Sequence, residues 1–160
     1  MTKYRKFSWG TKTFVMGIIN ATPDSFSGDG TALDLSASLV KAKEFIEYGV
    51  DVLDVGGESS RPSSIYNEVN QIEVEQELER VIPVIEAIRS ISDIPISIDT
   101  WKSEVAKEAI NYGASIVNDI WGLKKDSNMS AVVAQNHVGL ILTHNGTSSK
   151  YKDVVKETVI

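Results

Sequence analysis

The sequence predicts an α/β fold built on a parallel sheet. Short runs rich in Val, Ile and Leu alternate with longer segments of helical period, which is typical of parallel strands joined by crossover helices. The runs are nearly continuous in apolar residues, as expected of strands buried on both faces. Five such strands are expected, at residues 13–19, 52–55, 94–98, 115–117 and 138–142.

The segments between these runs carry the helix signal. An apolar stripe over residues 35–46 predicts a first helix, and Gly49 is a natural residue to follow its end. Apolar positions over residues 72–88 predict a second helix, in which Pro83 indicates either a kink or a new start. Two more helices are expected, at about 102–112 and 128–135.

Composition restricts the class of protein. The chain has 160 residues, 42% hydrophobic and 24% charged, which favours one soluble domain over residues 1–160. Its 16 Lys and Arg against 22 Asp and Glu argue against a nucleic-acid or membrane partner. The absence of cysteine excludes disulfides and thiolate metal sites but leaves an oxygen-ligated ion such as Mg²⁺. With no signal peptide or membrane span in the sequence, we expect a cytoplasmic protein.

Polar residues come directly after each expected strand. In α/β folds the carboxyl ends of the strands form the edge where ligands bind. Asp99 taken alone could simply cap the helix that follows it, but five polar positions in succession favour a site. These positions are Asn20, Gly56-Gly57-Glu58, Asp99, Asn118-Asp119 and His144-Asn145.

Two of the connections have the composition of functional loops. Residues 20–30 are rich in Gly, Asp and Ser, and they place the aromatic Phe26 beside two carboxylates. Residues 54–62 contain Gly56 and Gly57, which permit close backbone approach, and Arg61, whose guanidinium suits a phosphate. Neither loop has the Gly-Lys-Ser/Thr or Gly-x-Gly-x-x-Gly pattern of nucleotide-binding proteins.

These two loops resemble those of dihydropteroate synthase, the sulfonamide-target family of folate biosynthesis. The family's motifs read Asn-x-Thr-Pro-Asp-Ser-Phe-Ser-Asp-Gly-Gly and Gly-Gly-Glu-Ser-Thr-Arg-Pro-Gly, and both occur here in the same order. Together with similar segments at the later strands, the resemblance covers residues 14–145. The departures are the order Gly28-Asp29-Gly30, Ser60 for Thr, Ser63 for Gly and Thr143 for Met.

The resemblance implies a (β/α)8 TIM barrel, of which this chain supplies about the first five β/α units. It implies condensation of 6-hydroxymethyl-7,8-dihydropterin pyrophosphate with 4-aminobenzoate to 7,8-dihydropteroate and pyrophosphate, by a protein that is a homodimer when complete. A barrel of this kind needs about 250 residues. We therefore expect the pterin-binding domain to be incomplete at its C-terminus, with the family's late Lys, Arg and His beyond residue 160, and the chain alone to be inactive.

The resemblance also implies how the strand ends bind the pterin and the metal. A carboxylate can accept two neighbouring N–H donors of a pterin edge, and Asp99 is the expected acceptor. Asn118, which offers a donor and an acceptor, is expected to contact the rest of the ring edge. Asn20 is expected to supply an oxygen to Mg²⁺, which neutralises the leaving pyrophosphate.

The remaining site residues are expected in the two loops. Asp24 would stabilise positive charge on the pterin methylene, and Arg61 would pair with Asp24 or with phosphate, so these two are the expected catalytic residues. Ser60 would bind substrate in the same region. Phe26 and Pro62 would line the aminobenzoate pocket.

Two other functions remain open at this point. A methyltransferase acting on methyl-tetrahydrofolate shares the pterin-binding barrel and the strand-end Asp and Asn, although the loops at 20–26 and 56–62 favour the synthase. A non-catalytic pterin-binding fragment or an oligomerisation module would keep Asp99 and Asn118 without turnover.

Overall fold

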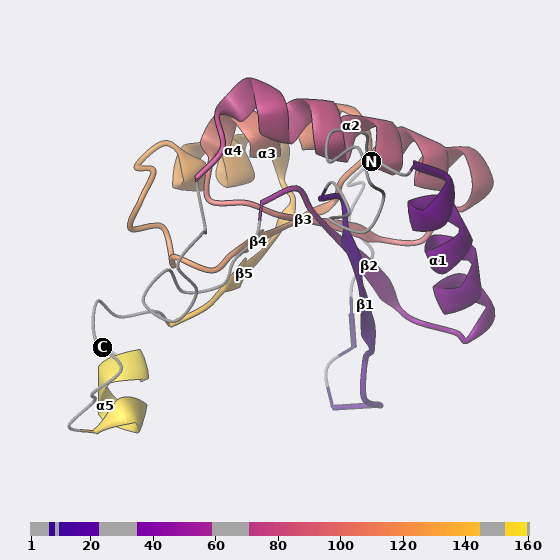
Figure 1. Ribbon diagram of the computed structural model, residues 1–160. Helices are drawn as coiled ribbons and strands as arrows, with labels where there is room; N and C mark the ends of the chain where they lie inside the picture. The colour runs from indigo at the N-terminus through magenta and orange to yellow at the C-terminus, as the bar shows by residue number, and fades with distance from the viewer. Residues whose placement is uncertain (1–6, 9, 23–34, 59–70, 145–152, 160) are drawn as a thin grey trace.

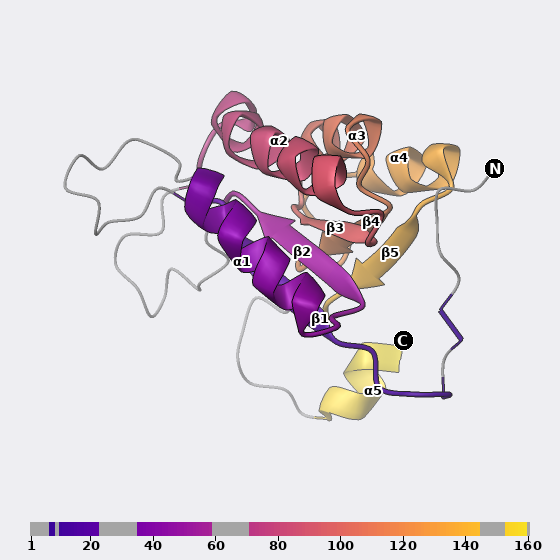
Figure 2. The same cartoon turned by 90° about the vertical axis from the view of Figure 1, so that its right-hand side faces the viewer.

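The computed structural model describes residues 7–8, 10–22, 35–58, 71–144 and 153–159. A five-stranded parallel sheet has the strand order β1-β2-β3-β4-β5, and helices α1 to α4 lie on one face of it (Figures 1 and 2). The α/β fold class is confirmed, as successive β/α units of a barrel. The strands are β1 (Met16–Asn20), β2 (Val52–Gly56), β3 (Ile96–Asp99), β4 (Ile116–Asp119) and β5 (Gly139–Leu142). The helices are α1 (Leu35–Glu47), α2 (Val74–Ile91), α3 (Ser103–Asn111), α4 (Met129–Asn136) and α5 (Val154–Val159).

The strands end later than the sequence predicted. β1, β3 and β4 extend one or two residues past the last apolar position, so Asn20, Asp99 and Asn118 lie within strands, not after them. Their backbone groups continue the parallel ladder; for example, Asn20 pairs with Gly56 and Asp99 with Asn118. The polar side chains are therefore carried on rigid backbone, whose direction the sheet fixes.

Burial on both faces of every strand was a wrong expectation. It holds for β2, but β1 alternates between exposed and buried residues, and Ile18 is 56% exposed. The buried residues of β1 are those that face the helices: Gly17 lies so close to Phe45 of α1 that an added Cβ would be 2.6 Å from its ring. Helices therefore cover one face of β1 and leave the other open among the described residues.

Helix α2 runs unbroken through Pro83, so the alternative of a second helix starting there is wrong. Its first turn is fixed by Glu73, whose N–H donates to the side chain of Gln76 in a capping box. The buried residues of α2 recur with the period of a helix and form one stripe that faces the sheet. They are Glu77, Val81, Val84, Ile85 and Ile88.

The core lies between the sheet and α1 to α4. Ile19, Val55, Ile98 and Val117 are neighbours in register across the first four strands, and all are fully buried in the hydrophobic cluster. None of the helices in the described ranges is long and apolar enough to cross a bilayer.

We predict that Ile85→Ala lowers the free energy of unfolding by about 2 to 5 kcal/mol, because it removes a fully buried side chain and leaves a cavity under the sheet. The matched control is Ile91→Ala on the same helix, where the side chain is 42% exposed. It should cost well under about 1 kcal/mol. Urea unfolding followed by circular dichroism measures both, and equal losses would contradict the packing described above.

Candidate active site

A row of site residues crosses the sheet on the face opposite the helices. The register aligns Asn20 with Gly56, Gly56 with Asp99, and Asp99 with Asn118. Side chains of directly paired residues in a parallel sheet point to the same face. One residue earlier on each strand is the apolar row of Ile19, Val55, Ile98 and Val117, which faces helices α1 to α4. The three strand-end residues predicted from the sequence are therefore brought onto one face of the sheet at its carboxyl edge.

Asp54 lies one layer below this row and was not assigned a role from the sequence. Its carboxylate is 4% exposed, and its Oδ2 accepts a hydrogen bond of 3.2 Å from Nδ2 of Asn118. Burial raises the pKa of Asp54, and the side chains of Ser97 and Asn118 offset part of that rise. An N–H of the Asn118 side-chain amide donates to Asp54. The side-chain carbonyl oxygen of Asn118 is therefore left to accept a hydrogen bond from a ligand.

Asp99 has the most perturbed acidity of the site. Its removal from water raises its pKa from 3.8 to about 7, and the charges of Asp54, Glu77, Asp119 and Glu58 add to the rise. Near neutral pH the group is therefore divided between its acid and carboxylate forms. A ligand that donates two N–H groups would select the carboxylate, so binding of such a ligand releases a proton.

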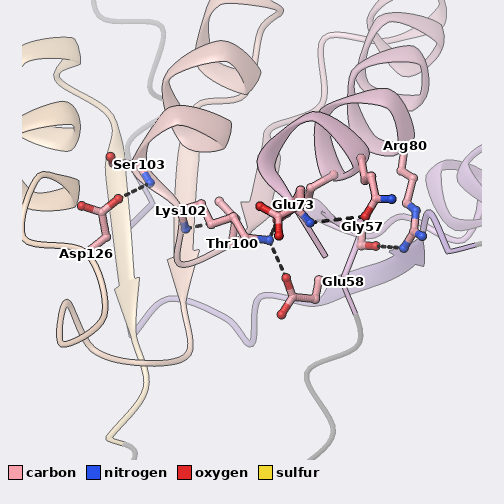
Figure 3. Close-up of polar contacts among 10 residues, drawn as sticks. Gly57, Glu58, Glu73, Arg80, Thr100, Lys102, Ser103 and Asp126 are labelled. Carbon is pink, nitrogen blue, oxygen red and sulfur yellow. Dashed lines mark hydrogen bonds and ion pairs between the residues drawn. The ribbon is translucent and has the colours of Figure 1, made fainter. Parts of the chain in front are cut away.

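The alternative that Asp99 caps the following helix is wrong. Helix α3 begins at Ser103, and the Ser103 N–H donates to Oδ2 of Asp126 at 2.8 Å, as Figure 3 shows. Asp126 lies in the β4–α4 connection, so a residue from the next unit satisfies this helix terminus. Asp99 is thereby left without a capping role, which favours a role in binding.

Asp119, the last residue of β4, organises the connection that follows it. Its Oδ1 accepts from the Trp121 N–H and its Oδ2 from the Leu123 N–H, both at 2.8 Å. The carboxylate is 1% exposed and serves this turn. Asp119 is thus a structural residue that also adds negative charge near Asp99.

A buried ion cluster lies where β2 meets α2 and α3. Nζ of Lys102 is 2.5 Å from Oε2 of Glu58 and 2.5 Å from Oε2 of Glu77. The sequence motifs contained Lys102 and Glu58, but neither received a role, and Glu77 lies in a pattern that indicates only an amphipathic helix. A charged residue at an apolar position of a helical stripe is the signal that would have found Glu77.

Not every predicted residue can be placed. Asp24, Phe26, Ser60, Arg61 and Pro62 lie outside the described residues, so both catalytic assignments and the aminobenzoate pocket stay predictions.

The side chain of Asn20 is exposed at the end of β1, where its amide oxygen is open to a ligand. In the portion of the chain that the structure describes, no three His, Cys, Asp or Glu residues gather as a metal site. A single oxygen from Asn20 nevertheless fits Mg²⁺, because this ion keeps several waters and is often held by one or two protein oxygens together with substrate phosphates.

Comparison with known proteins gives a consistent family. The family described as pterin binding enzyme matches residues 16–160. The dihydropteroate synthase of Clostridium beijerinckii is 45% identical over 96% of this chain and 55% of its own length. That of Bacillus subtilis is 45% identical over 98% of this chain and 53% of its own length. The chain thus spans about half the length of these curated relatives.

Solved structures agree. A Clostridium difficile dihydropteroate synthase, crystallised in the presence of pteroic acid, matches with a TM-score of 0.85 and 41% identity, over 96% of this chain and 57% of that one. A Xanthomonas albilineans dihydropteroate synthase with 4-aminobenzoic acid matches with a TM-score of 0.80 and 40% identity, over 93% and 52%.

We predict that Asp99→Asn removes a pH dependence of stability between about pH 4 and pH 7. Asp99 has a folded pKa of about 7 and an ordinary value of 3.8, so the folded state binds the proton more tightly. Its contribution to stability is present below pH 4 and lost as pH rises through 7. The Asn side chain carries no charge. At pH 8 the Asp99→Asn variant should therefore unfold at a higher urea concentration than the wild type.

Asp93→Asn is the control, because Asp93 is exposed in the connection between α2 and β3. Urea titrations at pH 5 and pH 8 decide the matter. If the stability difference between Asp99→Asn and the wild type is the same at both pH values, Asp99 is not the buried titrating group described here.

Proposed function

Because this chain belongs to the family of pterin-binding enzymes, we propose that it is the N-terminal part of a dihydropteroate synthase. The carrying observation is the row across the carboxyl edge of the sheet, in which Asp99 and Asn118 are direct neighbours above the buried Asp54. The relatives and solved structures compared above, all dihydropteroate synthases, favour this activity over the methyltransferase alternative.

In the proposed binding step, Asp99 accepts two neighbouring N–H groups of the pterin edge. Asn118 accepts a further donor through its carbonyl oxygen, since its amide nitrogen is engaged by Asp54. The proton held by Asp99 leaves on binding, and the two charge-assisted hydrogen bonds from the pterin N–H groups offset part of the cost of ionising a carboxyl among other carboxylates. The pterin ring would thereby be held against the strand ends.

In the proposed chemical step, the amine of 4-aminobenzoate forms a C–N bond to the methylene carbon of the pterin. The C–O bond to pyrophosphate breaks, the electron pair leaves with pyrophosphate, and the amine nitrogen passes its proton to water. Asn20 is proposed to hold Mg²⁺, which supplies positive charge to the leaving pyrophosphate when bound. Asp24 would stabilise positive charge on the methylene, and Arg61 would contact Asp24 or phosphate.

The two loops are proposed to complete the second substrate site. Ser60 would bond the substrate near the pyrophosphate, and Phe26 and Pro62 would form the walls for the flat ring of 4-aminobenzoate. The Xanthomonas albilineans structure that contains 4-aminobenzoic acid supports a site for this compound in a similar protein. A cytoplasmic location and a homodimer stay predictions from the sequence.

We predict that Asp99→Ala weakens binding of the pterin pyrophosphate by at least about 30-fold, because two ring donors lose a charged acceptor, a loss of roughly 2 to 5 kcal/mol. Isothermal titration calorimetry should be done on the complete protein that carries these residues, with Asp93→Ala as the exposed control. The wild type should also release a proton on binding near pH 7, seen as a dependence of the heat on the buffer. An affinity within threefold of the wild type would remove Asp99 from the pterin site.

Removal of magnesium should weaken the binding of the pterin only when the pterin carries its pyrophosphate group. We predict that a chelator weakens binding of the pterin pyrophosphate at least tenfold but leaves the affinity for the pterin alcohol, which lacks the pyrophosphate, unchanged. Asn20→Ala should reproduce the selective loss in the presence of Mg²⁺. A protein whose pterin pyrophosphate affinity is the same with and without chelator would exclude Asn20 as a metal ligand.

A further inference from the structure

The ammonium group of Lys102 is the buried centre of an ion cluster that joins three elements of the fold, β2, α2 and α3. The side chain is 7% exposed, and its Nζ contacts the carboxylates of Glu58, at the end of the β2 segment, and Glu77, on α2. Lys102 itself lies three residues after Asp99, at the start of α3. Figure 3 shows the ammonium directed at Glu58 from the α3 side.

The backbone next to Glu58 is fixed independently. The carbonyl of Gly57 accepts a hydrogen bond of 2.8 Å from Nη1 of Arg80, as drawn in Figure 3. A Cβ at Gly57 would lie 2.8 Å from Val81 and 3.3 Å from the backbone oxygen of Glu77, so the glycine is packed directly against α2. The two residues that follow β2 are therefore both held: α2 fixes the backbone of Gly57, and Lys102 fixes the side chain of Glu58.

This point of the chain adjoins Asp99. Gly56 is the register partner of Asp99, and a Cβ at Gly56 would lie 3.4 Å from Cβ of Asp99. In the sequence, Glu58 is followed at once by Ser59, Ser60 and Arg61. Any contact that Ser60 and Arg61 make with a substrate starts from the position at which Glu58 is held.

The cluster also influences the charge near Asp99. The carboxylates that face Asp99 come from β2 and its extension (Asp54 and Glu58), from α2 (Glu77) and from β4 (Asp119), and all four raise its pKa. Lys102 is the cation that directly contacts two of these four. Its positive charge therefore compensates the two carboxylates that it contacts, Glu58 and Glu77.

We propose that Lys102 is a positioning residue of the site: it fixes Glu58, the residue from which the loop with Ser60 and Arg61 departs, and it compensates the carboxylates that surround Asp99. This inference deepens the proposed function and rests on it for its kinetic consequence. Its structural and electrostatic consequences do not need turnover. Lys102 touches no reacting atom in this proposal.

The test compares Lys102→Met and Glu58→Ala with the wild type. The matched control is Lys107→Met, the same change at an exposed position of the same helix. Glu58→Ala removes the ion pair between Lys102 and Glu58 but keeps the buried pair of Lys102 and Glu77. It therefore tests the proposal even if Lys102→Met does not fold. Circular dichroism and thermal unfolding establish which variants are folded.

The first readout is amide hydrogen exchange of peptides that cover residues 53–58. Both Lys102→Met and Glu58→Ala should speed exchange at Gly57 and Glu58 at least tenfold, while Lys107→Met leaves it unchanged. The second readout is ¹³C NMR of the Asp99 carboxyl. Lys102→Met should raise its titration midpoint and Glu58→Ala should lower it, because one removes a cation and the other a carboxylate. Opposite shifts are not expected from a general loosening of the structure.

The kinetic readout uses the complete protein with both substrates. Glu58→Ala should raise the KM for the pterin pyrophosphate at least tenfold, because Ser60 and Arg61 follow Glu58 directly in the sequence and Ser60 is proposed to bind near the pyrophosphate. If the wild type forms dihydropteroate but neither variant alters exchange at Gly57 and Glu58, the positioning role is overturned. If the hydrogen-exchange and NMR results are as expected but the wild type binds no pterin, the proposed function is wrong and the positioning of Glu58 by Lys102 is still supported.

Discussion

The parallel register of β1 to β4 is the constraint on which the site depends. Side chains alternate between faces along a strand, so a shift of one residue in β3 would exchange Asp99 with Ile98. The apolar row of Ile19, Val55, Ile98 and Val117 prevents that shift, because each of these side chains is buried against the helices. The same packing that stabilises the fold therefore aligns Asn20, Gly56, Asp99 and Asn118 on the opposite face. The geometry of this row is therefore a consequence of core packing.

That alignment concentrates negative charge. Four carboxylates act on Asp99, and burial keeps water from screening them. The fold limits the cost by giving each of these four groups a fixed partner: Asp119 accepts two backbone N–H groups, Asp54 accepts from Asn118, and Lys102 contacts Glu58 and Glu77. Asp99 is the member whose proton affinity is left to respond to a ligand.

The sequence was informative about elements and about residue types, and less so about boundaries and partners. Apolar runs located all five strands, but they ended at the last Val or Ile, whereas the hydrogen-bonded ladder continues through Asn20, Asp99 and Asn118. Pro83 indicated either a kink or a new helix, and the second of these is wrong because α2 continues through it. The pairing of Lys102 with Glu77 joins residues 25 apart, and no local pattern encodes such a contact. Motif resemblance reached Asp99 and Asn118 because their chemistry is readable one residue at a time, while the partners of these residues are set by tertiary packing.

The anchoring on both sides of residues 59–70 bears on how this protein can change over evolutionary time. Glu58 is held by Lys102 before the segment, and the capping box of Glu73 and Gln76 fixes the start of α2 after it. Because both flanks are held by contacts outside the segment, a change in the number of residues between Glu58 and Glu73 leaves those contacts in place. Length variation there would leave the sheet and its row of polar residues in place.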